Sequence, residues 1–298
     1  MPSPDLACLQ PPRQHLFRLQ INRCACGGLI IASSSHHQAA DGYSMSTFFN
    51  AWVDAVGAGG AALLGRPVVP YGPGALVPRR PPHCEFEHRG VEFLHLHQIN
   101  CSSLPEPAVG VIKRPEIINT MLHYSSESVA QLKAIAENKY TTFETITAHL
   151  WRKITIARGR ADAEADACAT KLDVSVNGRA RLGVDSLPQD GFFGNVVLTA
   201  TSKSTAKELA RGGADEELEP VDGNEDYALS SESWLHLDLH KLDFGCGGRL
   251  LGVVPPRIPL DGVLVLIPNL HKGDGVDVFV ALCDRHAKEL RNIAYTLD

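Results

Sequence analysis

The sequence predicts a mixed α/β fold in two parts, and three observations lead to this prediction. Short segments alternate apolar and polar residues, which is the period of a half-buried strand. Longer segments repeat apolar residues at helical spacing. A stretch rich in proline and glycine, residues 67–82, lies between the first elements and the rest of the chain. Because proline lacks the amide donor and restricts the residue before it, this stretch is predicted to be a linker between lobes.

The first part is predicted to be a hairpin followed by a helix. Residues 17–22 alternate in polarity, Gly27 and Gly28 provide a turn, and residues 29–32 form a second apolar run. The period then changes, and one helical face is formed by Met45, Phe48, Phe49, Trp52, Val53 and Val56. His36 and His37 therefore lie at a junction between a strand and a helix.

The second part is predicted to contain strands and helices in alternation. A strand is expected at 117–124, then a helix with Val129, Leu132 and Ile135 on one face. A capping box at 141–144 begins a further helix whose inward residues are Phe143, Ile146, Leu150 and Ile154. Strands are expected at 172–176, 196–200, 250–254, 263–267 and 276–282, with a last helix from near Asp284. The acidic stretch 211–226 is expected to be disordered, because it is too polar to offset the entropy of ordering.

The composition narrows the classes of function. The 298 residues are 44% hydrophobic and 21% charged, as in globular proteins. A net charge of −6 gives no general field for a polyanion, so a nucleic-acid partner is not expected. No apolar run approaches a membrane span and no signal peptide is evident, so a cytoplasmic protein without a membrane partner is predicted. The eight cysteines are scattered, which favours reduced thiols, and no metal site is expected because neither paired histidine segment, 95–97 or 236–240, has an evident third ligand.

The segment from His37 to Asp41 has the pattern HxxxD, which is a weak signal when it is taken alone. Asp41 reads equally well as the cap of the helix that begins at Gly42. Three later segments change the interpretation, because together with HxxxD they form an ordered set. They are VNGRAR at 176–181, GFFGN at 191–195 and DFGCG at 243–247.

This ordered set resembles the BAHD acyltransferases, a family of plant acyl-CoA-dependent enzymes. The resemblance implies a two-lobed α/β fold with mixed sheets, similar to chloramphenicol acetyltransferase. Because HxxxD stands well inside family chains but at position 37 here, we expect the N-terminal lobe to be largely missing. The expected divisions are a remnant of that lobe with HxxxD at 1–66, a crossover linker at 67–90 and the C-terminal lobe with DFGxG at 91–298.

The resemblance also implies the reaction. The amino-acid sequence of the C-terminal half resembles that of the family branch that moves hydroxycinnamoyl or benzoyl groups from acyl-CoA to amines such as agmatine or tryptamine. Acyl-CoA is then a co-substrate, and no bound cofactor or metal is expected. By resemblance His37 is the general base, and histidine suits this role because its ordinary pKa is about 6.5. Two alternatives stay open: a hydroxyl-acylating hydroxycinnamoyltransferase of the same family, and a catalytically inactive truncated remnant.

Further roles come from matching the motifs. Asp41 is expected to face away from the substrate channel, pair with Arg179 and support the loop that carries His37. A structural turn near the CoA entrance is expected from Asp243, Phe244, Gly245 and Gly247. Candidate contacts to the acceptor are Glu232 and Trp234, although a lone acid is usually a surface group and a tryptophan usually belongs to the core. The intact family implies a monomer, and self-association is an open expectation for this shorter chain.

Overall fold

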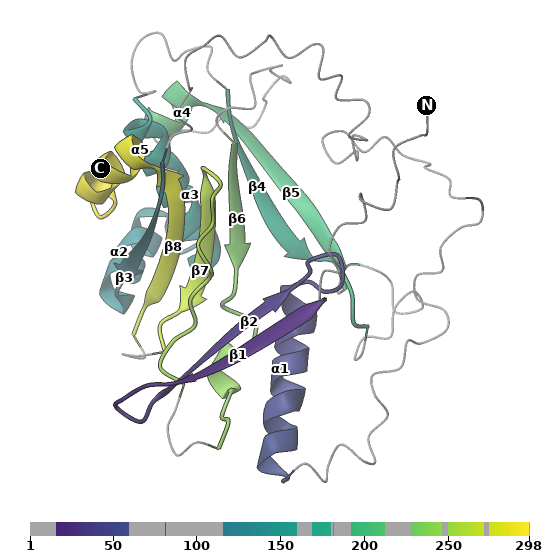
Figure 1. The fold of residues 1–298 in the computed structure, drawn as a ribbon. Coiled ribbons are helices and arrows are strands. Elements are labelled where there is room, and N and C mark those ends of the chain that lie inside the picture. Colours follow the sequence, from purple (N-terminus) through teal and green to yellow (C-terminus); the bar gives the residue numbers. More distant parts are fainter. Residues whose placement is uncertain are drawn as a thin grey trace, which may run out of the picture.

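A computed structural model describes residues 16–59, 81, 116–159, 169–179, 181, 192–211, 228–245, 250–270 and 274–297. These residues form a large mixed sheet with helices packed on it, and a separate hairpin followed by a long helix (Figure 1). The predicted α/β class is therefore confirmed.

The large sheet has six strands in the order β3-β8-β7-β6-β4-β5. The strands are β3 (Ile117–Tyr124), β4 (Ala169–Asn177), β5 (Val197–Thr205), β6 (Ala228–Ser233), β7 (Val263–Pro268) and β8 (Val276–Cys283). Strand β6 runs parallel to both β4 and β7, and the other neighbours are antiparallel. The C-terminal ends of β4, β6 and β7 therefore meet at one end of the sheet, which is the end that carries the candidate site.

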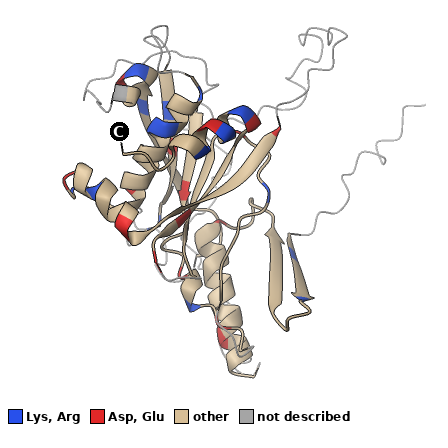
Figure 2. Cartoon of the chain, turned by 90° about the vertical axis from the view of Figure 1, so that its left-hand side faces the viewer, with Lys and Arg blue, Asp and Glu red and all other residues tan. Residues whose placement is uncertain are grey.

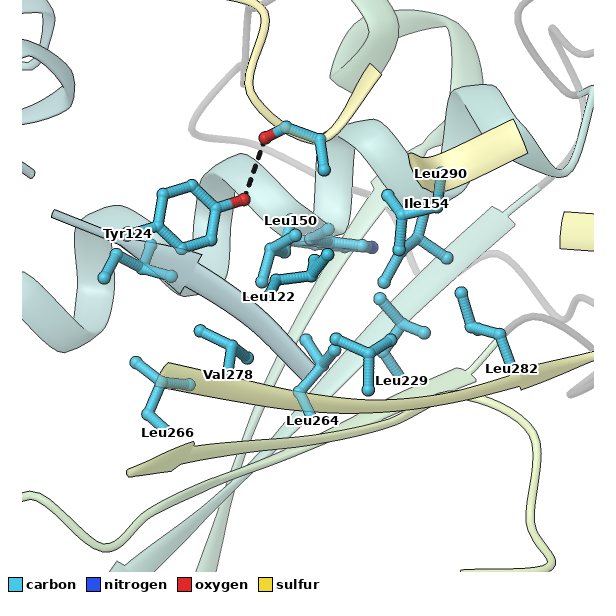
Figure 3. Packing of buried hydrophobic residues seen from close by; sticks show 14 of the residues in the cluster. Leu122, Tyr124, Leu150, Ile154, Leu229, Leu264, Leu266, Val278, Leu282 and Leu290 are labelled. Atoms are coloured by element: carbon cyan, nitrogen blue, oxygen red, sulfur yellow. Dashed lines mark hydrogen bonds between the residues drawn. The ribbon is translucent and has the colours of Figure 1, made fainter. Parts of the chain in front are cut away.

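One face of this sheet is covered by α2 (Ser126–Ile135), α3 (Thr142–Ala157) and α5 (Asp284–Ile293). A short helix, α4 (Ala206–Arg211), follows β5. Figure 3 shows the main core between sheet and helices, which includes Leu122, Leu150, Ile154, Leu229, Leu264 and Val278. Helix α3 begins with the predicted capping box. The backbone amide of Thr141 donates to the Glu144 carboxylate at 2.8 Å, and the backbone amide of Glu144 donates to Thr141 Oγ1 at 3.2 Å.

The hairpin and its helix lie below the large sheet in Figure 1. Strands β1 (Phe17–Arg23) and β2 (Leu29–Ser35) pair antiparallel, and α1 (Gly42–Gly57) follows. Helix α1 touches the chain after β6 at two places: Ser46 donates a hydrogen bond to the carbonyl of Leu237, and the ring of Trp52 meets that of Phe244 edge-on at 4.9 Å between centroids. Figure 2 shows this helix as almost uncharged, and Asp54 is its one charged residue.

Most predicted elements are confirmed, and the structure differs from the prediction at several places, including a short 3-10 helix at Leu239–Lys241 that was not predicted. Residues 250–254 form no strand, and they are followed directly by Pro255 and Pro256, which lack the amide hydrogen that a strand ladder needs. Strand β6 was not predicted, since its sequence ALSSES has only two apolar residues and a weak period. Helix α4 was not predicted either, because its six residues are too few for a helical period.

The predicted burial was wrong at several apolar positions. The hairpin is not half-buried, because Ile21 is 57% exposed and Ile30 is 58% exposed. Phe48, Val56 and Ile135, which belong to the predicted apolar faces of their helices, are exposed. An apolar period identifies the type of element, but it does not identify which neighbour covers its face.

The predicted linker at 67–90 and the acidic stretch at 211–226 lie outside the described residues, apart from Pro81 and Arg211. The division into lobes therefore stays a prediction. Within the described ranges, no helix is both long and apolar enough to span a membrane. Nor does that part of the chain gather three or more His, Cys, Asp or Glu side chains into a possible metal site.

Candidate active site

His37 lies in the turn that joins β2 to α1, and its side chain is exposed. The turn is closed by two backbone hydrogen bonds: the amide of His36 donates to Leu16 O at 2.8 Å, and that of Ala39 donates to His36 O at 2.8 Å. The side-chain amide of Asn195 donates through Nδ2 to the backbone carbonyl oxygen of His37 at 2.6 Å. Among the described residues the imidazole of His37 has no hydrogen-bond partner.

Asp41 caps α1, as its sequence position allowed, and it also forms the predicted ion pair. Its carboxylate is 3% exposed and accepts four hydrogen bonds. The backbone amides of Ser44 and Val196 donate two of these bonds, both at 2.9 Å. The guanidinium of Arg179 donates the other two, at 2.8 and 3.1 Å, in the bidentate geometry typical of strong arginine–carboxylate pairs. Asp41 is thus used entirely for holding the site together.

Arg179 follows the end of β4 and is held on several sides. Its Nη2 also approaches Ser44 Oγ at 2.9 Å and Gly194 O at 2.8 Å. Its Nη1 approaches Asn177 Oδ1 at 3.3 Å, and the guanidinium lies over the ring of Tyr43 at 4.7 Å from the centroid. Its Nε is buried without a hydrogen-bond partner among the described residues. Arg179 is therefore a buried residue of the site and not an ordinary surface arginine.

The pKa of Asp41 is lowered from its ordinary value. Burial by itself would raise this pKa, because the charged form loses water. The hydrogen bonds from Arg179 and from the amides of Val196 and Ser44, together with the charge of Arg179, outweigh burial. The carboxylate is consequently ionised at neutral pH, and it compensates the buried guanidinium.

The segment 192–196 joins the ion pair to the histidine turn. Ser44 Oγ donates to Gly194 O at 2.9 Å and accepts from Gly194 N at 3.0 Å. A Cβ atom at position 194 would come within 2.7 Å of the ring of Phe192, so a side chain there would require this ring to move. The GFFGN motif was noted in the sequence, but no roles were assigned to Ser44, Gly194 or Asn195. The bonds that define these roles connect to the backbone, and backbone contacts leave no pattern of residue types.

The second motif lies against α1 rather than beside His37. Asp243 Oδ1 accepts from the amide of Gly245 at 2.9 Å, and Gly245 has a φ of 68°, a region that favours glycine. Phe244 forms the ring contact with Trp52. These contacts describe a tight turn that supports the helix after His37. Gly247 lies outside the described residues, and the position of this motif near a CoA entrance stays a prediction.

Glu232 and Trp234 lie at the end of β6. Leu229 and Ser231 are buried toward the helices, so strand alternation places Glu232 on the opposite face. Trp234 packs against a small core cluster on that second face, formed by Val265, Ile267, Phe279 and Ala281. Trp234 therefore has a structural role in the sheet, whereas Glu232 presents a partly exposed carboxylate.

The arrangement defines a class of protein. It is a mixed α/β sheet with a histidine turn beside a buried ion pair, and the fold is that of the chloramphenicol acetyltransferase-like acyltransferases. Vinorine synthase shares it with a TM-score of 0.62 at 19% identity, over 92% of this chain and 64% of that chain. TRI101 from F. sporotrichioides, solved with coenzyme A and T-2, shares it with a TM-score of 0.61 at 18% identity, over 93% of this chain and 68% of that chain.

The sequence comparisons identify the family. The model of the Transferase family matches residues 3–222. Tryptamine hydroxycinnamoyltransferase 2 of Oryza sativa subsp. japonica is 33% identical over 95% of this chain and 70% of its own length. Agmatine coumaroyltransferase-1 of Hordeum vulgare is 32% identical over 96% of this chain and 71% of its own length. The chain belongs to the Transferase family, the BAHD acyltransferases, as its motifs indicated.

Proposed function

We propose that this protein transfers an aromatic acyl group, hydroxycinnamoyl or benzoyl, from coenzyme A to an amine, with His37 as the general base. The observation that carries the proposal is the fixed histidine turn. Asn195 binds the backbone carbonyl of His37, and the Asp41–Arg179 pair fixes the start of α1 directly after the turn. The imidazole is exposed and has no hydrogen-bond partner in the described part of the chain. The acceptor class is supported by the similarity to tryptamine and agmatine acyltransferases.

The reaction follows from the chemistry of the two substrates. A protonated amine has no lone pair, so the attacking nitrogen must lose a proton before or during attack on the thioester carbonyl. The ammonium proton passes to solvent, and His37 takes a second proton from the nitrogen as the carbon–nitrogen bond forms. When the carbon–sulfur bond breaks, the imidazolium returns a proton to the departing thiolate. The products are an amide and free coenzyme A, and no acyl-enzyme is formed.

Glu232 is the proposed contact for a cationic acceptor. It lies on the face of the sheet opposite the helices and at the end where the histidine turn docks. Hydrogen bonds to charged groups typically contribute about 1.5–3 kcal/mol, so Glu232→Gln should raise the KM for agmatine by roughly tenfold or more. The KM for tryptamine, which has no second cation, should change much less. Glu289→Gln, at an exposed acid on α5, is the matched control.

A matched pair of acceptors tests the reaction itself. The purified protein is given p-coumaroyl-CoA or benzoyl-CoA with tryptamine or with tryptophol, which differs in carrying a hydroxyl in place of the amine. Thiol release and product mass are followed. We expect release that depends on tryptamine or agmatine. Release with tryptophol alone would establish the hydroxyl-acylating alternative, and no release with any pair would establish the inactive remnant.

A further inference from the structure

Asn195 contacts the backbone of the histidine turn from a distant part of the sequence. Its Nδ2 donates to the carbonyl oxygen of His37 at 2.6 Å. This oxygen belongs to the peptide unit between His37 and Gln38, so the bond restrains rotation about the backbone bonds beside the His37 α-carbon. The direction of the imidazole depends on this backbone, because the ring is attached to the same α-carbon.

The residues on either side of Asn195 are themselves anchored. Gly194 bonds through its carbonyl and its amide to Ser44 Oγ, and its carbonyl also accepts from Arg179 at 2.8 Å. The amide of Val196 donates to Asp41 at 2.9 Å, and the carbonyl of Val196 accepts from Gly178 at 2.8 Å. Asn195 therefore extends from a fixed base, and its amide can act as a rigid support for the turn.

We infer that Asn195 is a positioning residue, whose side-chain amide clamps the His37 peptide and aims the imidazole at the thioester and acceptor. This inference rests on the proposed role of His37 as the base. Asn195 is the last residue of the GFFGN segment, and this segment connects the buried ion pair to the exposed histidine. The Asp41–Arg179 pair then acts on the base from two directions: through the start of α1, and through Asn195.

Because Asn195 and His37 are both exposed, a positioning role of Asn195 can be distinguished from a merely structural one. Water can replace an exposed hydrogen bond at little cost in stability. A buried bond such as Asp41–Arg179 affects folding and activity together. Loss of the clamp should affect the geometry of the turn and leave folding nearly unchanged, which is a combination that an experiment can recognise.

The kinetic test compares Asn195→Ala, Asn195→Gln and the control Asn22→Ala, which removes a side-chain amide that also donates to a backbone carbonyl, that of Ile30 in the hairpin. Misplacing a catalytic group by about 1 Å can cost about 10²-fold in rate. We expect Asn195→Ala to lower kcat by roughly 10- to 100-fold, with the KM for acyl-CoA and the Tm nearly unchanged. Asn195→Gln keeps the donor on a longer stem and should recover part of kcat. Wild-type kcat in Asn195→Ala, or a large fall in Tm, would overturn the clamp.

A second measurement does not need turnover. Proton–nitrogen NMR of the imidazoles, with the His37 signals assigned by their loss in His37→Gln, reports the surroundings of this ring directly. We expect Asn195→Ala to shift or broaden the His37 signals, while Asn22→Ala leaves them in place. Unchanged His37 signals in Asn195→Ala would contradict the clamp. Full activity in His37→Gln together with altered signals in Asn195→Ala would refute the proposed base and leave the clamp standing.

Discussion

The large sheet with its helices and the hairpin with α1 are held together in different ways. In the sheet lobe, interdigitated apolar side chains fill the space under α2, α3 and α5, and residues such as Leu264 and Ile154 are fully buried (Figure 3). Among the described residues no comparable core forms at the hairpin, where Ile21 and Ile30 are more than half exposed. The candidate base belongs to this second region. Within the described residues, its position relative to the sheet therefore depends on polar contacts, the ring contact of Trp52 with Phe244 and the contact of Arg179 with the ring of Tyr43.

This difference explains why so many hydrogen bonds converge on Asp41. Apolar contacts tolerate small shifts, whereas bidentate and capping hydrogen bonds fix both distance and direction. The bonds from Arg179 connect the end of β4 to the first turn of α1, and the bond from Val196 connects the start of β5 to the same carboxylate. Polar contacts thus provide the precision that catalysis needs in the region where packing is sparse.

The largest expected effect comes from breaking the buried ion pair. Arg179→Ala and Asp41→Ala should each destabilise the fold by about 3–5 kcal/mol, because each leaves an uncompensated buried charge. The double variant should lose much less than the sum, since contacting residues are not additive. Urea unfolding measures all three free energies, and turnover should follow the same pattern.

An exposed ion pair is the control for this cycle. Asp238 and Lys241 approach to 2.9 Å with both side chains more than half exposed, so replacing either should leave the free energy of unfolding nearly unchanged. Additive losses for Asp41 and Arg179 would show that the two residues act independently, contrary to the bidentate geometry.

Core and hairpin truncations compare the two regions directly. Leu264→Ala in β7 should destabilise the protein by about 2–5 kcal/mol, because it removes a fully buried side chain and leaves a cavity. Ile30→Ala in β2 should change stability by less than about 0.5 kcal/mol, since surface substitutions rarely do more. Both values come from urea unfolding. Equal losses at the two positions would show that another surface covers the hairpin in solution.

The two helix caps provide a finer comparison. Thr141 and Asp41 are both N-cap residues, but Thr141 only caps α3 whereas Asp41 also holds Arg179. Thr141→Ala should destabilise by about 1 kcal/mol, as expected for the loss of a cap alone. A Thr141→Ala loss as large as that of Asp41→Ala would mean that the ion pair adds nothing to the cap.

The smallest effect is expected from pH. Because the pKa of Asp41 is lower in the folded state than its ordinary value of 3.8, ionised Asp41 contributes stability that is fully present above this value. That contribution is lost as the pH falls through the folded pKa. The stability difference between wild type and Asp41→Asn should therefore be constant near neutral pH and shrink below about pH 3.8. Urea unfolding at pH 3, 5 and 7 checks this, and a difference that grows on acidification would contradict the sign.

Much of this site was predicted from the sequence, on two different grounds. Capping and periodicity indicated the hairpin, the helices and a cap at Asp41, because these features depend on neighbouring residues. The pairing of Asp41 with Arg179 came only through the family resemblance, since the two residues are far apart in the chain. The contacts of Ser44, Gly194 and Asn195 were not predicted, because they involve backbone groups that every residue type carries. The exposure of the hairpin was also not predicted, because the polarity pattern of a strand does not reveal whether another part of the protein covers its apolar face.

The central claim is that His37 is the base in acyl transfer, and a pair of alanine variants tests it most directly. His36 precedes His37 in the same turn, and its Nδ1 accepts from the amide of Gln38 at 3.3 Å, which is a local contact. We predict that His37→Ala lowers kcat for the tryptamine or agmatine reaction by roughly 10² to 10⁴, the usual contribution of a general base. His36→Ala should retain most of the wild-type rate. Equal losses in the two variants, or wild-type turnover in His37→Ala, would contradict the account.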